Sequence, residues 1–259
     1  MKIAIVGTGH MGSWFARELS KGHEVAVYDR DLAKSERLKG VRHLAGIAAV
    51  GEYDPKLLIN AVTLRNTVEA FEAVSPYLKK DCIICDMASI KERIAGYYTR
   101  AGFDFVSIHP MFGPTFADME KVREENAVII TESCEQGGQF FTRFFARLGV
   151  RIFEYSFDEH DAMMAYSLTT PFVSSMIFAA CVDAKTAPGT TFKRHMAIAG
   201  SLLAEDDHLL AEILFNPHSV TEINRITSRL EFLKHIIMAK DQDEAAEFFR
   251  RLRENIGGI

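Results

Sequence analysis

The chain has 259 residues, which is long for one domain and sufficient for two, and 48% of them are hydrophobic. Its formal net charge is −5 and it has no basic stripe, so the composition excludes a typical nucleic-acid-binding surface. Four cysteines are too few for a disulfide framework in a chain of this size. The first predicted strand begins at the N-terminus, which leaves no room for a targeting segment, so we expect a globular cytoplasmic protein.

The first thirty residues have the pattern of a dinucleotide-binding site. An apolar run at 3–6 leads into a Gly-x-Gly-x-x-Gly turn, after which 13–20 is expected to be a helix and 24–28 a second strand. In such a turn the first glycine permits the tight bend, the second lets the backbone approach a pyrophosphate, and the third allows helix and strand to pack closely. The N–H groups that begin the helix would face the phosphates. The cofactor-binding residues expected here are Gly7, Gly9, His10, Met11 and Gly12.

An acidic residue closes the second strand. Asp29 lies where a carboxylate would bind the adenosine ribose hydroxyls of NAD. A 2′-phosphate would meet this carboxylate, so Asp29 favours NAD, whereas the following Arg30 could soften the repulsion and leaves NADP open. Val62 and Thr63, at the end of a later predicted strand, complete the expected cofactor site.

Strands alternate with helices over about the first 150 residues. This alternation predicts an α/β fold, a doubly wound Rossmann-type parallel sheet, as domain 1–155. Ligands of such a sheet bind beyond the carboxyl ends of the strands, where Gly7, Thr63, Ser89 and His109 are expected to converge. The predicted strands are 3–6, 24–28, 57–62, 82–87, 103–108, 128–131 and 150–154, with a further short strand proposed at 46–50; the predicted helices are 13–20, 31–39, 67–78, 90–100 and 135–148.

The pattern changes at residue 156, and the region 156–259 is predicted to be an all-helical domain. Its expected helices are 159–184, 191–205, 207–215, 219–238 and 243–254. They are long and weakly amphipathic, so we expect apolar surface to be buried between two subunits of a homodimer. The stretch 162–182 has no charged residue, but its hydroxyl groups and missing basic flanks favour a helix buried between domains or subunits over a membrane span.

Cys82 and Cys85 form a C-x-x-C motif inside a predicted buried strand. Residues three apart on a strand point to opposite faces, so a redox or metal role is not expected there. No metal site is predicted elsewhere in the chain.

The strand-end residues are the candidates for chemistry. Oxidation of an alcohol by a nicotinamide cofactor needs a base for the hydroxyl proton, and His109 is the best placed histidine for that role. Ser89 could reach the substrate oxygen or orient the imidazole, and it could equally cap a helix beginning at Ile90. Lys91 could attract an anionic substrate or could be a solvated lysine on that helix.

The helical domain contributes a second group of candidates. Lys193, Arg194 and His195 form a basic cluster in an otherwise uncharged stretch, which suits carboxylate binding as well as a solvated helix face. His160, in Glu159-His160-Asp161, could be an interdomain hydrogen-bonding residue, while the two acids suit the start of a helix.

Over essentially its whole length the chain resembles the prephenate/arogenate dehydrogenases of tyrosine biosynthesis. The resemblance rests on four segments: Gly7-Thr8-Gly9-His10-Met11-Gly12, Asp86-Met87-Ala88-Ser89-Ile90-Lys91, His109-Pro110-Met111-Phe112-Gly113-Pro114 and Glu159-His160-Asp161. It implies that His109 accepts the C4 hydroxyl proton while a hydride leaves C4 for NAD(P), carbon dioxide departs and the ring becomes aromatic. It also implies that Ser89 hydrogen-bonds within this arrangement, that Gly113 contacts the substrate, and that the helical domain forms a dimer.

The chain departs from that family at positions that concern the substrate. Many members have H-L-P-H where this chain has Thr169-Thr170-Pro171-Phe172, and many have a carboxylate-binding arginine for which Lys193 and Arg194 are the expected stand-ins. Pro114 replaces a threonine of other members. The preference between prephenate and arogenate therefore stays open.

Prephenate dehydrogenase with NAD is the leading interpretation, and three alternatives accompany it. One is an arogenate (cyclohexadienyl) dehydrogenase. Another is a two-domain dehydrogenase for a hydroxy or imino acid, whose relatives usually rely on a lysine of the helical domain. The third is a catalytically silent NAD-sensing regulator, which the presence of both Ser89 and His109 disfavours.

Overall fold

The computed structural model describes residues 1–112, 122–183, 187–205 and 207–257, which form two compact units, Met1–Met164 and Ala165–Ile259. The first unit extends past the boundary expected at residue 155 because it includes helix α7 (Phe157–Met164). This helix contacts strands β7 and β8 and helix α5 of the first unit.

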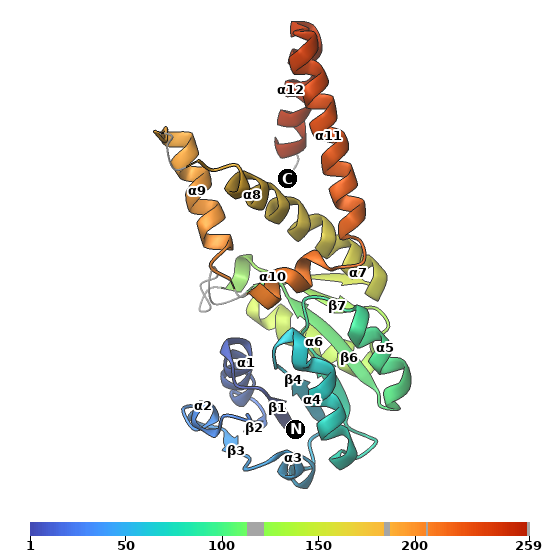
Figure 1. Ribbon diagram of the computed structural model, residues 1–259. Coiled ribbons are helices and arrows are strands. Elements are labelled where there is room, and N and C mark those ends of the chain that lie inside the picture. The colour runs from blue at the N-terminus through green and yellow to red at the C-terminus, as the bar shows by residue number, and fades with distance from the viewer. Residues whose placement is uncertain (113–121, 184–186, 206, 258–259) are drawn as a thin grey trace. The chain divides into compact units, whose positions relative to one another are not determined.

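The first unit is built on one eight-stranded sheet in the order β3-β2-β1-β4-β5-β6-β7-β8 (Figure 1). The pairs from β3 through β6 are parallel, which confirms the Rossmann-type fold, but β7 pairs with β6 antiparallel, so β7 and β8 run in the reverse direction. The expectation of a wholly parallel sheet is therefore wrong at this edge. The strands are Lys2–Val6, Glu24–Tyr28, Arg42–His43, Leu57–Asn60, Ile83–Asp86, Phe105–Pro110, Asn126–Ile130 and Arg151–Tyr155, numbered β1 to β8.

The helices of this unit mostly follow the predicted periodicity, with one exception. The segment expected to be a strand at 46–50 is helical, because α3 covers Ile47–Tyr53 and ends where Asp54 takes up a left-handed conformation at φ 57°. A short apolar run does not distinguish a strand from a buried helix. The α-helices are α1 His10–Ser20, α2 Leu32–Ser35, α3, α4 Thr67–Val74, α5 Glu92–Ala101, α6 Glu135–Leu148 and α7; 3₁₀ turns cover Leu64–Asn66, Ser75–Tyr77 and Val122–Glu124.

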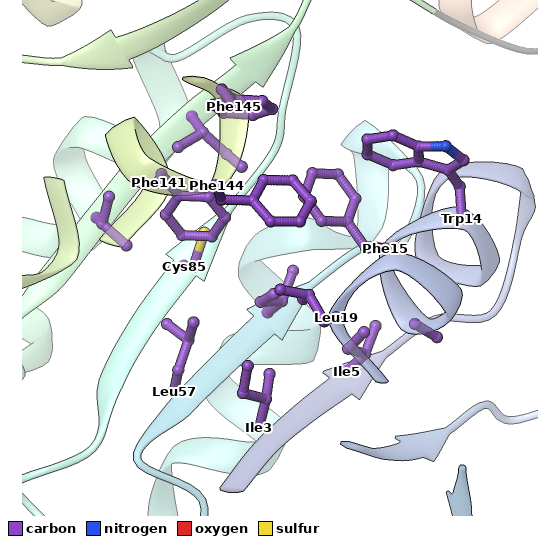
Figure 2. Packing of buried hydrophobic residues seen from close by; sticks show 14 of the residues in the cluster. Ile3, Ile5, Trp14, Phe15, Leu19, Leu57, Cys85, Phe141, Phe144 and Phe145 are labelled. Carbon is purple, nitrogen blue, oxygen red and sulfur yellow. The ribbon is translucent and has the colours of Figure 1, made fainter. Parts of the chain in front are cut away.

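Two hydrophobic cores lie on the two faces of the sheet. Helices α1 and α6 cover one face with aromatic side chains, including Trp14, Phe15 and Phe144, which pack together in Figure 2. Helices α3, α4 and α5 cover the other face. Cys85 belongs to the first core and Cys82 to the second, as the alternation of a strand requires.

The second unit is helical in the residues that the structure describes. Its helices are α8 Thr170–Ala180, α9 Thr190–Leu202, α10 Asp207–Leu214, α11 Ser219–Ala239 and α12 Gln242–Gly257, and a π-helical turn, Ala165–Thr169, leads into α8. Within the described residues, Phe157–Ala180 is one continuous helical stretch long and apolar enough to cross a membrane by length and composition. Within a single chain only 17% of the most apolar 18-residue segment of this helical stretch is buried. Its burial between domains or subunits stays a prediction.

Candidate active site

The turn after β1 has the close contacts that its glycines were expected to allow. Gly7 has a φ of +92°, and a Cβ there would lie 2.7 Å from the carbonyl oxygen of Ala61. At Gly12 a Cβ would lie 2.0 Å from the carbonyl oxygen of Gly7, so α1 packs directly on the turn. At Gly9 a Cβ would meet nothing within 4 Å, which leaves the outer side of the turn open.

A cleft of about 480 Å³ opens beside this turn, within the first unit. Six of the residues expected to bind the cofactor line it: Gly7, Gly9, Asp29, Arg30, Val62 and Thr63. His10, Met11 and Gly12 instead form the first turn of α1, where His10 is exposed and the Met11 side chain packs against the core. Gly9 has no side chain with which to cap this helix. The first backbone N–H groups of α1 can therefore donate hydrogen bonds to a bound anion.

Asp29 both shapes the turn and faces the cleft. Its Oδ2 accepts hydrogen bonds from the backbone N–H of Thr8 at 2.7 Å and from the Thr8 hydroxyl at 2.9 Å, and its Oδ1 accepts one from the N–H of Asp31 at 2.9 Å. Burial by itself would raise the pKa of Asp29, but these hydrogen bonds outweigh it and hold the pKa below its usual value. The group is therefore a carboxylate near neutral pH.

His109 is the fifth residue of β6 and lies at the carboxyl end of the parallel part of the sheet. Its Nδ1 lies 3.0 Å from Nε2 of His160, and Nδ1 of His160 lies 2.9 Å from Oδ1 of Asp161. Burial lowers the pKa of His109 well below its ordinary value, and the positive charges that His160 and Lys91 can carry lower it further. A neutral imidazole at a strand end can accept a proton.

Lys91 is neither a solvated lysine nor a cation that faces a substrate, and both expectations for it are wrong. Its side chain is fully buried, and its Nζ donates to Oδ2 of Asp86 at 2.6 Å and to the carbonyl oxygen of Ile108 at 2.7 Å. The backbone N–H of Lys91 donates to both carboxylate oxygens of Asp161, at 2.8 and 3.1 Å. Lys91 therefore joins β5, β6 and α7 beneath the catalytic candidate.

Asp86 is the buried ion-pair partner of Lys91 in this network. Besides Lys91 it accepts hydrogen bonds from the Tyr98 hydroxyl at 2.8 Å and the Ala88 N–H at 2.9 Å. Burial raises the pKa of Tyr98 well above its ordinary value, and the Asp86 charge adds to the effect. Sequence reasoning missed this part of the site, although an aspartate at the end of an apolar strand, five residues before a lysine, was a usable signal.

Ser89 lies in the connection between β5 and α5 and is partly buried. Helix α5 begins at Glu92 with Lys91 at the capping position, so Ser89 is not the N-cap of a helix that starts at Ile90. Its contact with substrate stays a prediction.

The remaining predicted substrate-binding residues belong to the second unit or lie outside the described residues. Gly113 and Pro114 lie outside the described residues. Lys193, Arg194 and His195 are exposed on α9 of the second unit, and the His195 ring lies 5.5 Å from that of Phe178. Their role as carboxylate-binding residues stays a prediction.

Comparison with known proteins identifies the first unit. The sequence profile described as "Prephenate dehydrogenase, nucleotide-binding domain" matches residues 15–154. The chain is 25% identical to the "Probable arogenate/prephenate dehydrogenase" of Methanocaldococcus jannaschii, with 99% of this chain and 61% of that protein aligned. It is 26% identical to the T-protein of Haemophilus influenzae, with 96% of this chain and 62% of that protein aligned.

Solved structures show the same fold. The prephenate dehydrogenase of A. aeolicus, determined in complex with hydroxyphenyl propionate and NAD+, superposes with a TM-score of 0.85 at 19% identity and covers 100% of this chain and 98% of its own. The chain spans about three fifths of the length of the two curated relatives above. Because the profile matches more than half of its residues, this chain belongs to the prephenate dehydrogenase family.

Proposed function

We propose that the protein is an NAD-dependent prephenate dehydrogenase that converts prephenate into 4-hydroxyphenylpyruvate and carbon dioxide in tyrosine biosynthesis, and that it acts in the cytoplasm. The observation that carries the proposal is the half-buried, neutral His109 at the carboxyl end of β6, on the same sheet edge as the nucleotide cleft. Ligands of open α/β sheets bind along this edge.

The proposed cofactor suits the residues of the cleft. The open side of Gly9 and the first N–H groups of α1 fit a pyrophosphate, and the Asp29 carboxylate fits a ribose with two free hydroxyls. Strand β6 is three strands from β1, a distance of about 14 Å, so a dinucleotide extended along the edge would point its far end towards His109. When bound, NAD would supply the hydride acceptor.

The chain's own residues then have one main chemical task. His109 takes the proton of the C4 hydroxyl as the hydride leaves C4, and the electron pair of the breaking C1–carboxylate bond completes the aromatic ring. The protonated His109 then returns its proton to the C4 oxygen, which gives the phenol of the product. Aromatisation drives the reaction strongly, so orientation of C4 and one proton acceptor are the protein's principal contributions. Ser89, in the loop after β5, is proposed to hydrogen-bond the C4 oxygen.

The proposal is tested by comparing prephenate with arogenate, each with NAD and with NADP, and by following absorbance of the reduced cofactor. We expect the largest kcat/KM for prephenate with NAD. A larger value for arogenate would support the arogenate dehydrogenase alternative, and no turnover with either would support a regulatory protein.

Replacing Asp29 by serine should weaken NAD binding about tenfold or more and improve the use of NADP. The change removes a charged hydrogen-bond acceptor and the negative charge that would repel a 2′-phosphate, while Arg30 and Lys34 remain in the cleft. The measurement is KM for each cofactor. Asp31→Ser, which changes a neighbouring acid that does not line the cleft, is the control. Unchanged discrimination in Asp29→Ser would show that Asp29 does not bind the ribose.

We further propose that Lys193 and Arg194 bind the substrate carboxylates. Both are exposed and belong to a stretch with few other charges, so they are available to an anionic ligand. Replacing each by alanine should raise KM for prephenate at least fivefold in one of the two variants, since a charge-assisted hydrogen bond is worth about 1.5–3 kcal/mol. Unchanged KM in both would place the carboxylate site elsewhere.

A homodimer through the helical unit is the proposed assembly. Large apolar side chains are exposed on α8, α9, α11 and α12 of the isolated chain, among them Ile177, Ile198, Ile237, Phe249 and Ile256. Burial of such surface between two copies would stabilise the assembly. Sedimentation equilibrium should give twice the chain mass.

A further inference from the structure

His160 lies between His109 and Asp161, and its side chain is fully buried. The proposed reaction uses His109 as the base and assigns no task to His160. Both nitrogens of the His160 ring nevertheless have a hydrogen-bond partner in the first unit, so the two contacts together restrict where its proton can be.

Asp161 determines which nitrogen of His160 is protonated. The Asp161 carboxylate already accepts the backbone N–H of Lys91 through both oxygens, so it acts as an acceptor towards the ring as well. Nδ1 of His160 is therefore the donor in the 2.9 Å contact. Burial lowers the pKa of His160 despite the opposing effect of Asp161, so the ring is neutral and its Nε2 carries no proton.

The proton of His109 follows from that of His160. An unprotonated Nε2 on His160 accepts at 3.0 Å from Nδ1–H of His109, and a neutral His109 then keeps a free lone pair on its own Nε2. We infer that His160 is a positioning residue that holds His109 in the Nδ1-protonated tautomer and thereby makes Nε2 of His109 the proton-accepting atom. The assignment of the tautomer stands on the two hydrogen-bond distances together with the burial of the His160 ring; its consequence for turnover rests on the proposed function.

The charged groups around the two rings are consistent with this arrangement. Lys91 and Asp86 face them from the β5–α5 segment, and Asp161 faces them from α7. Lys91 and Asp86 act on the pKa of His160 in opposite directions, and Asp161 is the charged group in hydrogen-bond contact with its ring. In serine proteases, loss of the carboxylate that holds the catalytic tautomer lowers turnover by about 10⁴. A neutral histidine in that place is expected to have a smaller effect.

Two variants of His160 distinguish the loss of the hydrogen bond from the loss of the imidazole ring. His160→Gln keeps an oxygen that can accept from Nδ1–H of His109, whereas His160→Leu removes the acceptor and leaves a buried donor unsatisfied. We expect kcat for prephenate to fall about 10- to 100-fold in His160→Leu, with KM for prephenate and NAD changed less than about threefold. His160→Gln should recover most of the loss. Equal losses in both variants would overturn the inference.

Nitrogen-15 NMR of the histidine rings tests the tautomer directly in the wild-type protein, without any substrate. The chemical shifts distinguish a protonated from an unprotonated ring nitrogen, and His109→Asn identifies which resonances belong to His109. We expect Nδ1 of His109 to be protonated and Nε2 unprotonated at pH 7. A proton on Nε2 would overturn the inference even if the protein oxidises prephenate.

Failure to oxidise prephenate, with the Nδ1-protonated tautomer observed, would instead reject only the proposed function. If His160→Leu does not fold, the wild-type spectrum and His160→Gln still decide the question.

Discussion

Replacing His109 by asparagine should lower the turnover of prephenate by about 10²- to 10⁴-fold, with little change in NAD affinity. Asparagine retains an amide close to the position of Nδ1, so the contact with His160 can persist while the proton-accepting Nε2 is lost. The nucleotide cleft lies around the glycine turn and Asp29, away from this substitution. The expected result is therefore a fall in kcat, measured at saturating NAD.

The matched control is His43→Asn, which makes the same change at an exposed histidine of the edge strand β3. It should leave kcat close to that of the wild type. Near-normal turnover in His109→Asn would remove His109 as the base, and an equal loss in both variants would show that the effect is not specific to the active site.

The kcat/KM of the wild type should decrease on the acid side of its pH profile. Burial lowers the pKa of His109 well below the ordinary histidine value of about 6.5, so the neutral base is present both at neutrality and for some distance below pH 6.5. As the pH falls through the lowered pKa, His109 becomes protonated and kcat/KM should decrease. An acid limb centred at or above pH 6.5 would contradict this environment for His109.

Replacing Lys91 by methionine should lower the free energy of unfolding by about 3–5 kcal/mol. The change removes one partner of a fully buried ion pair, and among the described residues the Asp86 carboxylate keeps hydrogen bonds from the Tyr98 hydroxyl and the Ala88 N–H. The carbonyl oxygen of Ile108 also loses its donor. Urea denaturation followed by the fluorescence of Trp14, which lies in the core of the same unit, measures the loss.

An exposed ion pair provides the control. Lys56 contacts Asp81 at 2.5 Å, but the two side chains are 49% and 60% exposed, so water and salt screen the pair and Lys56→Met should have a much smaller effect. The double change Asp86→Asn with Lys91→Met removes both buried charges and should recover part of the stability. A loss in Lys91→Met no larger than that in Lys56→Met would show that the buried pair is not important for folding.

Much of the nucleotide site was predictable because its signals are local. The glycine turn, the helix after it and Asp29 lie within thirty residues, and Gly7 and Gly12 make close backbone contacts that a side chain would block. The strand end at His109 was predictable for a similar reason, since the mostly apolar run 105–108 leads directly into His109 and Pro110, the last two residues of β6.

The errors arose where distant segments decide the outcome. The direction of β7 depends on its pairing with β6, and neither strand carries a local mark of that pairing. The short apolar run at 46–50 is compatible with a strand and with a helix. It is part of α3 in the structure, where Val50 and Tyr53 pack into the core on one side of the helix. Lys91 was misjudged because a lysine near a helix start is usually solvated, and only the fold brings Asp86 and Ile108 to its ammonium group.

By itself, then, the amino-acid sequence determined the dinucleotide-binding turn, the alternation of strands and helices, the helical character of the described second part and the placement of His109 at a strand end, because these depend on residues close together in the chain. Tertiary structure alone decided that His160 lies against His109, 51 positions away, and that Asp161 accepts the N–H of Lys91, 70 positions away. Hydrogen bonds between such distant residues exist only after the sheet and α7 have packed, and the pKa of His109 depends on that packing.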